Sequence, residues 1–138
     1  MNDELHEKTR ALLREAITSF EMLDIVLLMR GEPTVTWTTR SMADRVNVPE
    51  ELVARALQEL DAAGLVVACG APSNPQFQYR PARPELSAAA DALAADFAEH
   101  RVAVLSAMST NAIERLRSGA LTAFSDAFVL GRKPKADR

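Results

Sequence analysis

The segment that most constrains the fold is VPEELVARALQELDAAGLVV, from Val48 to Val67, because it joins a helix to a strand across one glycine. Pro49 suits the first position of a helix, where its missing N–H costs no hydrogen bond. Gly64 stands where a left-handed residue is wanted at a helix end. Between them the apolar residues recur at helical spacing and form one stripe: Leu52, Val53, Ala56, Leu57 and Leu60. The pattern predicts an amphipathic helix over 49–63 that leads straight into a strand.

Beyond Gly64 the pattern changes from helical spacing to that of strands. Residues 65–69 predict one strand, GAPSNP a loop, and residues 76–80 a second strand with strict apolar and polar alternation. Prolines at 81 and 84 end the pattern. We therefore expect a β-hairpin, and the β-prone residues 35–37 predict one further, very short strand.

Two helices are expected before this segment. No proline or glycine occurs from Asp3 to Arg30, which favours one long helix, with a joint at Thr18–Ser19 as the alternative. Thr38 can then cap a short second helix through its hydroxyl, with Met42, Ala43 and Val46 facing inward.

The chain returns to helical periodicity from Leu86 onward. Two alternatives are open for this region. A helix break at Ser109–Asn111 is favoured by Asn111 and Glu114, which fit a capping box, and the other alternative is one continuous helix. The expected divisions are residues 1–83, a helical extension over 84–130 and a basic flexible tail over 131–138.

The stretch WTTRSMADRVNVPEELVARALQELDAAGLV, residues 37–66, resembles the core motif of bacterial transcriptional regulators of the MarR-like and related winged-helix families. The resemblance rests on Met42-Ala43, the anchors Val46 and Val48, and the ending from Leu60 to Val66. It covers roughly residues 17–81 and is more specific for the fold than for the function. It implies a mainly α protein with a small β-hairpin, a winged helix-turn-helix domain plus a C-terminal helical dimerisation extension.

The resemblance also implies a DNA-binding transcriptional regulator that acts as a homodimer, with the helix over 49–63 in the major groove and the wing over 65–80 on the DNA backbone. On the expected outer face of that helix, arginine can pair with guanine, glutamine with adenine, and glutamate can accept from cytosine. The candidate DNA-binding residues on the two helices and the wing are Thr38, Arg40, Arg45, Glu51, Arg55, Gln58, Ser73, Asn74, Arg80 and Arg83.

Charge leaves a second function class open. Affinity for DNA comes largely from phosphate neutralisation, yet residues 30–83 carry six basic and six acidic side chains. Glu50 and Glu51 are also explained without DNA, since acids in a first turn stabilise a helix by about 0.3–1 kcal/mol. The alternative is a winged-helix protein–protein interaction module without intrinsic DNA binding. Arginines gathered in one patch favour DNA, and scattered ones favour a protein partner.

Two apolar stripes in the C-terminal region predict the dimer interface, because so small a domain cannot easily cover them. They comprise Leu93, Phe97 and Val104, then Ile113, Leu116, Phe124 and Phe128. The alternative is that these helices fold back on their own domain. The basic cluster over 132–138 can contact phosphates or simply solubilise the chain end.

No other pattern predicts chemistry. The five glycines form no phosphate-binding or nucleophile motif, and His6 and His100 have no partner at metal-ligand spacing. We expect Cys69 to be a small buried strand residue rather than a reactive thiol. We expect no enzyme, no metal, no cofactor and no membrane segment, and a cytoplasmic location; an effector ligand stays unknown.

Overall fold

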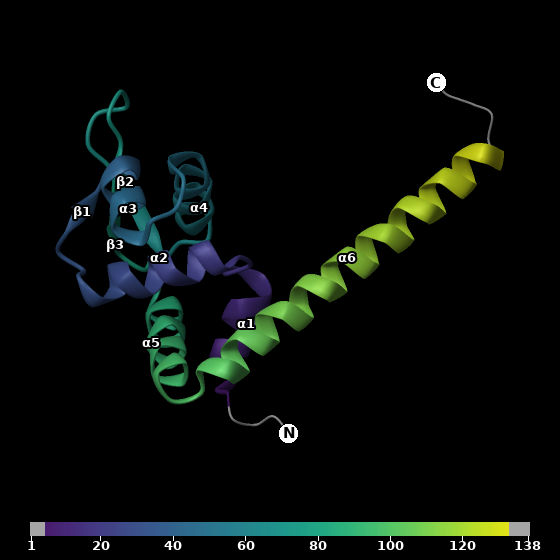
Figure 1. The fold of residues 1–138 in the computed structure, drawn as a ribbon, viewed down its shortest axis with the longest axis horizontal. Coiled ribbons are helices and arrows are strands. Elements are labelled where there is room, and N and C mark those ends of the chain that lie inside the picture. Colours follow the sequence, from purple (N-terminus) through teal and green to yellow (C-terminus); the bar gives the residue numbers. More distant parts are fainter. Residues whose placement is uncertain (1–4, 133–138) are drawn as a thin grey trace.

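The protein is mainly helical with one small antiparallel sheet, as the computed structural model in Figure 1 shows. The structure describes residues 5–132, and side chains for residues 5–119. In chain order the elements are α1 (Glu7–Glu15), α2 (Phe20–Gly31), β1 (Thr36–Trp37), α3 (Thr39–Val46), α4 (Glu50–Ala62), β2 (Val66–Cys69), β3 (Gln76–Tyr79), α5 (Pro84–Glu99) and α6 (Arg101–Arg132).

The long N-terminal helix expected from the sequence is two helices, α1 and α2, so the alternative with a joint is correct. The break lies at residues 16–19, where Ser19 has extended backbone angles and caps α2. Its hydroxyl accepts a hydrogen bond from the Met22 amide at 3.2 Å. Serine competes for local backbone donors and so favours caps over helix interiors, which is why the break falls there.

Capping residues set both ends of α3 and the start of α4. Thr38 and Ser41 form a capping box at the start of α3, each side chain accepting from the other's amide at 3.0 Å. Asn47 ends α3 in the left-handed region with φ of 60°. Pro49 is the residue before α4 rather than its first helical residue, a shift of one position from the sequence prediction.

The sheet has three strands in the order β1-β3-β2, so β1 adds one strand to the predicted hairpin. Both pairings are antiparallel, with Trp37 opposite Phe77 and Phe77 opposite Ala68. Gly64 has φ of 86°, a backbone angle that glycine adopts without steric cost, and it turns the chain from α4 into the hairpin. The loop between β2 and β3 forms one extremity of the molecule in Figure 1.

One apolar core joins the helices and the sheet. It centres on α2, whose Met22, Leu23, Ile25, Val26 and Met29 are all buried. The core continues into α5 and α6 through Leu93, Val104 and Met108. The C-terminal region therefore begins as part of the same core as the sheet and the first four helices.

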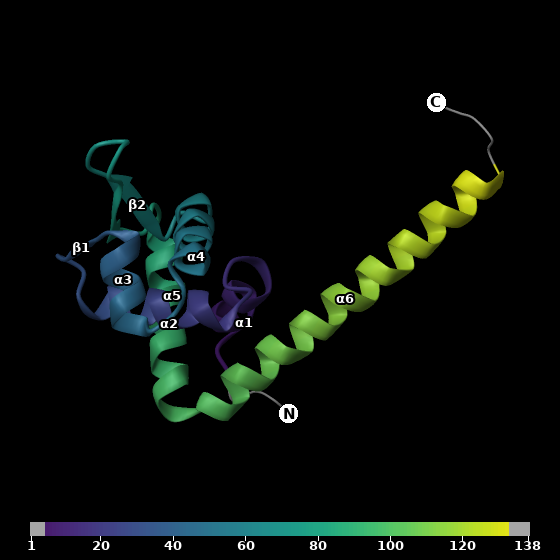
Figure 2. The ribbon, with the colours of Figure 1, turned by 45° about the horizontal axis from the view of Figure 1, so that its top comes forward.

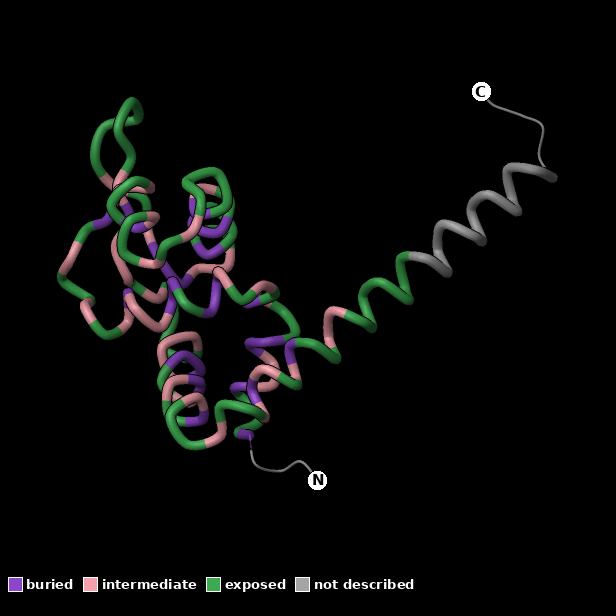
Figure 3. The backbone as a smooth tube through the Cα atoms, viewed as in Figure 1, coloured by how far each residue is buried: buried purple, intermediate pink, exposed green. Residues whose placement is uncertain are grey.

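The last helix does not break at Ser109–Asn111; α6 is continuous from Arg101 to Arg132. The break comes earlier, at His100, which separates α5 from α6. After its buried residues Val104 and Met108, α6 projects away from the rest of the molecule in both views (Figures 1 and 2). Over residues 101–119, the part of α6 whose burial is described, the buried positions all lie in its first turns (Figure 3). Gly131 and Arg132, assigned to the tail from the sequence, are its last residues, and residues 133–138 lie outside the described range.

Candidate nucleic-acid interface

The N-terminal ends of α3 and α4 are joined by a hydrogen bond. The Thr39 hydroxyl donates to Glu50 Oε2 at 3.2 Å, which links the first residue of α3 to the first residue of α4. Thr38 and Arg40, one residue to either side of Thr39, therefore lie beside the start of α4. The Glu50 carboxylate is thus used within the chain, a pairing that the sequence did not reveal because eleven residues separate the partners.

The outer face of α4 is uncovered. Glu51, Arg55 and Gln58 are exposed, as the amphipathic pattern predicts. Leu52 was expected in the buried stripe but is 40% exposed. At 100° per residue it lies about 90° from the centre of the other four apolar positions, at the edge of the stripe. The exposed face of α4 therefore combines two charged groups, an amide and an apolar side chain.

Arg45 is engaged within its own chain. Its guanidinium lies 2.8 Å from Glu32 Oε2, and it sits over the Trp37 ring at 5.6 Å from the centroid. The ion pair joins the end of α3 to the residue that ends α2, and the ring contact holds it against β1. To reach a phosphate, Arg45 would have to give up the ion pair, although such an exposed pair contributes only about 0–1 kcal/mol.

Arg80 and Arg83 lie at the base of the hairpin, away from the loop that carries Ser73 and Asn74. The Arg80 amide donates to the Leu65 carbonyl at 3.1 Å, next to the C-terminal end of α4. Arg83 immediately precedes α5, with Nε 3.9 Å from Glu85 Oε1. Ser73 and Asn74 are exposed in the loop. Both arginines lie at the base of the hairpin, whereas Ser73 and Asn74 lie in its loop.

The five arginines thus fall into three places: the N-terminal part of α3 with α4, the end of α3, and the hairpin base. Among residues 5–119, Arg40, Arg55 and Arg80 are exposed and have no hydrogen bond or ion pair through their side chains. The positive charge available for phosphate contacts is therefore dispersed over these three places and does not form a single dense patch.

The residues expected at a dimer interface divide into four groups. Leu93 and Val104 are fully buried inside their own chain, so no partner is needed to cover them. Phe97 is half-buried, with the Arg101 guanidinium 4.7 Å from its ring centroid. Ile113 and Leu116 are exposed on α6. Phe124 and Phe128 lie outside the residues whose side chains the structure describes.

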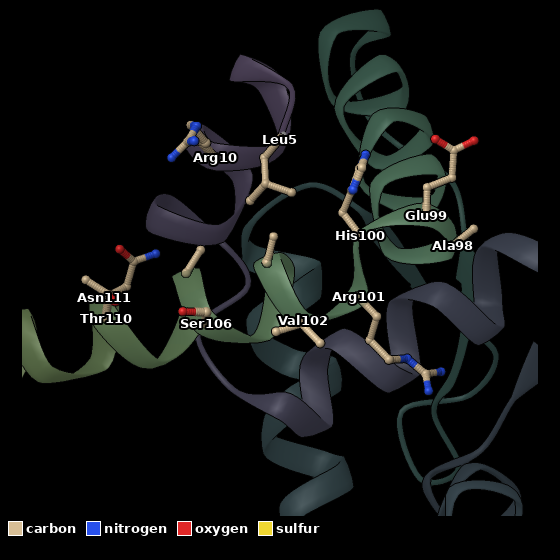
Figure 4. A pocket seen from close by; sticks show the side chains of 12 residues that line it. Leu5, Arg10, Ala98, Glu99, His100, Arg101, Val102, Ser106, Thr110 and Asn111 are labelled. Atoms are coloured by element: carbon tan, nitrogen blue, oxygen red, sulfur yellow. The ribbon is translucent and has the colours of Figure 1, made fainter. Parts of the chain in front are cut away.

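A groove of about 800 Å³, which no pattern in the sequence indicates, lies at the opposite end of the fold. Figure 4 shows it between the start of α1, the end of α5 and the first turns of α6. Leu5, Arg10, His100, Ser106 and Asn111 are among its lining residues. The groove is mixed in polarity and open to solvent, and its side chains have no arrangement that indicates a particular ligand.

One buried carboxylate holds the N-terminal end of α1. Asp96 Oδ2 accepts from the His6 amide at 2.9 Å, and Asp96 Oδ1 lies 2.8 Å from His6 Nδ1. Burial alone would raise the pKa of Asp96, but the nearby Thr9 hydroxyl and the hydrogen bonds with His6 outweigh it, so that the pKa lies below its usual range. This pair explains His6 as a structural residue.

The structure also bears on Cys69, on metal binding and on membrane segments. Cys69, expected to be buried, is half-buried at the end of β2. Within residues 5–132 no group of three or more histidine, cysteine, aspartate or glutamate side chains could hold a metal ion. None of the helices described is both long and apolar enough to cross a bilayer.

Comparison with known proteins adds no relative: no family model, curated protein or solved structure matches the chain.

Proposed function

We propose that this protein is a cytoplasmic DNA-binding regulator of transcription, built as a winged helix-turn-helix, in which α4 enters the major groove of double-stranded DNA. The observation that carries the proposal is the α3–turn–α4 pair, tied at its N-terminal ends by Thr39 and Glu50, with the outer face of α4 uncovered. In helix-turn-helix docking the second helix reads bases while the first crosses the backbone. The β2–β3 hairpin then serves as the wing.

The residues have different roles in this docking. Arg55 and Gln58 lie on the exposed face of α4 and suit guanine and adenine edges, and Glu51 can accept from cytosine. Thr38 and Arg40, beside the start of α4, and Ser73 and Asn74 in the hairpin loop suit phosphates and sugars, which fix register without reading sequence. Arg45, Arg80 and Arg83 lie farther from this surface. They contribute to binding through the long-range electrostatic attraction between their charges and the DNA phosphates.

A pair of variants tests this docking. Arg55→Ala removes a proposed base contact, whereas Arg14→Ala removes the same charge from an exposed position on α1 and is the matched control. Selection of bound fragments from a random duplex library should give one consensus for the wild type and for Arg14→Ala. Arg55→Ala should lose preference at one position, about 1–3 kcal/mol or roughly 5- to 150-fold. An unchanged consensus and affinity for Arg55→Ala would refute the docking.

A protein-interaction module is the second candidate, favoured by two observations. Residues 30–83 carry six basic and six acidic side chains, and the arginines among them are dispersed. Leu52 is exposed on α4, where an apolar side chain suits a protein surface. Stoichiometric co-purification of one protein from native cells, abolished by changing Glu51 and Gln58, would establish this alternative; a clean purification would count against it.

We also propose that the protein acts as a homodimer. Two copies related by a two-fold axis would place two α4 helices on two half-sites of one duplex, which explains how a small reading surface reaches useful specificity. The exposed apolar residues of α6, Ile113 and Leu116, support this proposal.

A further inference from the structure

Leu52 is an apolar side chain on the surface of α4 that the sequence pattern predicts to be buried. It is 40% exposed, whereas Val53, Ala56 and Leu57 are at most 4% exposed. Among residues 5–119 it is the only large apolar side chain of α3 or α4 that is exposed. Isolated exposed leucines are common on protein surfaces, so the position of Leu52 decides what it can do.

The position of Leu52 is in the first turn of α4, as its third helical residue. In helix-turn-helix docking the N-terminal residues of the second helix contact the edges of the bases. Glu50, the first residue of this turn, already accepts a hydrogen bond from the Thr39 hydroxyl at 3.2 Å. The first turn of α4 therefore presents Glu51 and Leu52 to a duplex in this docking.

Leu52 is also a neighbour of Arg55 on the helix surface. The two residues are three positions apart, so their Cβ atoms lie about 5–6 Å apart and about 60° from each other around the helix axis. Successive base pairs of a duplex are stacked about 3.4 Å apart. A base that Leu52 contacts therefore lies within about two base pairs of the base that Arg55 contacts.

The major groove presents one apolar group that suits a leucine, the C5-methyl of thymine. The other groups of the base edges are hydrogen-bond donors and acceptors, and a leucine side chain can pair with none of them. Covering such a group with leucine removes its water partner and gives nothing in return, which is unfavourable. Contact with the thymine methyl instead removes apolar surface of both partners from water, which is favourable.

We infer that Leu52 is a specificity-determining residue that recognises thymine through its C5-methyl group, within about two base pairs of the base that Arg55 contacts. The inference rests on the proposed function, because it requires α4 to lie in the major groove. It adds an apolar contact to the hydrogen bonds proposed for Arg55, Gln58 and Glu51. It also explains how a face with an exposed leucine can serve DNA as well as a protein surface.

Replacing thymine by uracil in the selected duplex tests this contact, with affinity measured by fluorescence anisotropy. Uracil lacks the C5-methyl but keeps the hydrogen-bonding groups of thymine, so only the apolar contact is lost. Wild-type affinity should fall about fourfold for each thymine replaced, the ratio that corresponds to about 0.8 kcal/mol for one buried CH₂-sized group. Leu52→Ala should bind both duplexes with nearly equal affinity, because its side chain is too short to reach the methyl.

One control is made in the protein and one in the DNA. Val102 is 79% exposed at the start of α6, so Val102→Ala shortens an apolar side chain far along the chain from α4 and should keep the wild-type ratio between the two duplexes. Exchange of a thymine outside the selected site should leave the affinity of wild type and Leu52→Ala unchanged.

The outcomes separate this inference from the proposed function. Equal wild-type affinity for the thymine and uracil duplexes, or the same fourfold ratio in Leu52→Ala, would overturn the inference and leave DNA binding in place. So would a consensus without thymine within about two base pairs of the position that Arg55→Ala alters. Failure of the wild-type protein to select any duplex would instead overturn the proposed function, and the inference with it.

Discussion

Replacing Asp96 by asparagine should destabilise the protein by about 2–3 kcal/mol, although the change alters only one side chain of the alanine-rich helix α5. Its carboxylate is 3% exposed and accepts from both the amide and the ring of His6. Asparagine has the same shape but only one accepting oxygen, so its amino group would face a donor. A hydrogen bond to a charged group contributes about 1.5–3 kcal/mol, and the exposed His6 ring can turn to water for compensation, so the estimate is close to one such bond.

The loss should depend on pH in a defined direction. The pKa of Asp96 is lowered in the folded protein, because the nearby Thr9 hydroxyl and the hydrogen bonds with His6 outweigh the opposing effect of burial. A carboxyl with a depressed pKa contributes stability above its unfolded value of about 3.9, and this contribution is lost as the pH falls through the folded value. The free-energy difference between wild type and Asp96→Asn should therefore be full at pH 6 and shrink below about pH 4.

Urea unfolding of Asp96→Asn and Asp91→Asn at pH 6 and pH 3.5 measures this effect. Asp91, on the same helix, pairs with Arg30 at 2.9 Å, but the two side chains are 59% and 35% exposed, so its replacement should cost at most about 1 kcal/mol. If the two variants were equally stable at pH 6, or if the Asp96 deficit persisted undiminished in acid, the reasoning would be refuted.

Three further predictions concern stability, each measured by urea or thermal unfolding. Asn47→Gly should be nearly neutral while Asn47→Val costs about 1–2 kcal/mol, because the residue has φ of 60°; equal effects would contradict the left-handed turn. Leu57→Ala, at a fully buried position, should cost about 2–5 kcal/mol, but Leu52→Ala under about 1 kcal/mol; similar losses would mean that Leu52 is buried in solution. Gly64→Ala should cost about 1–2 kcal/mol, since φ is 86° and the new Cβ would lie 3.0 Å from Leu86 Cδ1; an unchanged midpoint would contradict that geometry.

The helices and the hairpin could be predicted because local rules and global packing agree there. Thr38 is a cap, Gly64 a helix stop, and Phe77 an inward strand residue in both the sequence pattern and the structure. The boundary at His100 could not be predicted, because nothing local ends a helix between Glu99 and Arg101. It depends on how α5 and α6 both pack against α1, which is a long-range property.

The sequence predicts which side chains of the candidate site are exposed on α4. It does not predict which of the charged side chains pair with one another. The exposure of Glu51, Arg55 and Gln58 follows from helical periodicity. The engagement of Arg45 with Glu32 depends on a contact between segments thirteen residues apart, which spacing does not reveal. The pairing of His6 with Asp96 spans ninety residues and was beyond any local pattern.

The most direct test of the DNA-binding proposal is selection by the purified protein from pooled genomic DNA fragments at two salt concentrations, with the bound fragments sequenced. We expect enrichment of a palindromic site whose half-sites lie on one face of the duplex. Affinity should also fall steeply with salt, because each neutralised phosphate contributes a slope of about 0.9 in log affinity against log salt. A fragment pool without enrichment, even at low salt, would contradict DNA reading by α4 and favour the protein-interaction module.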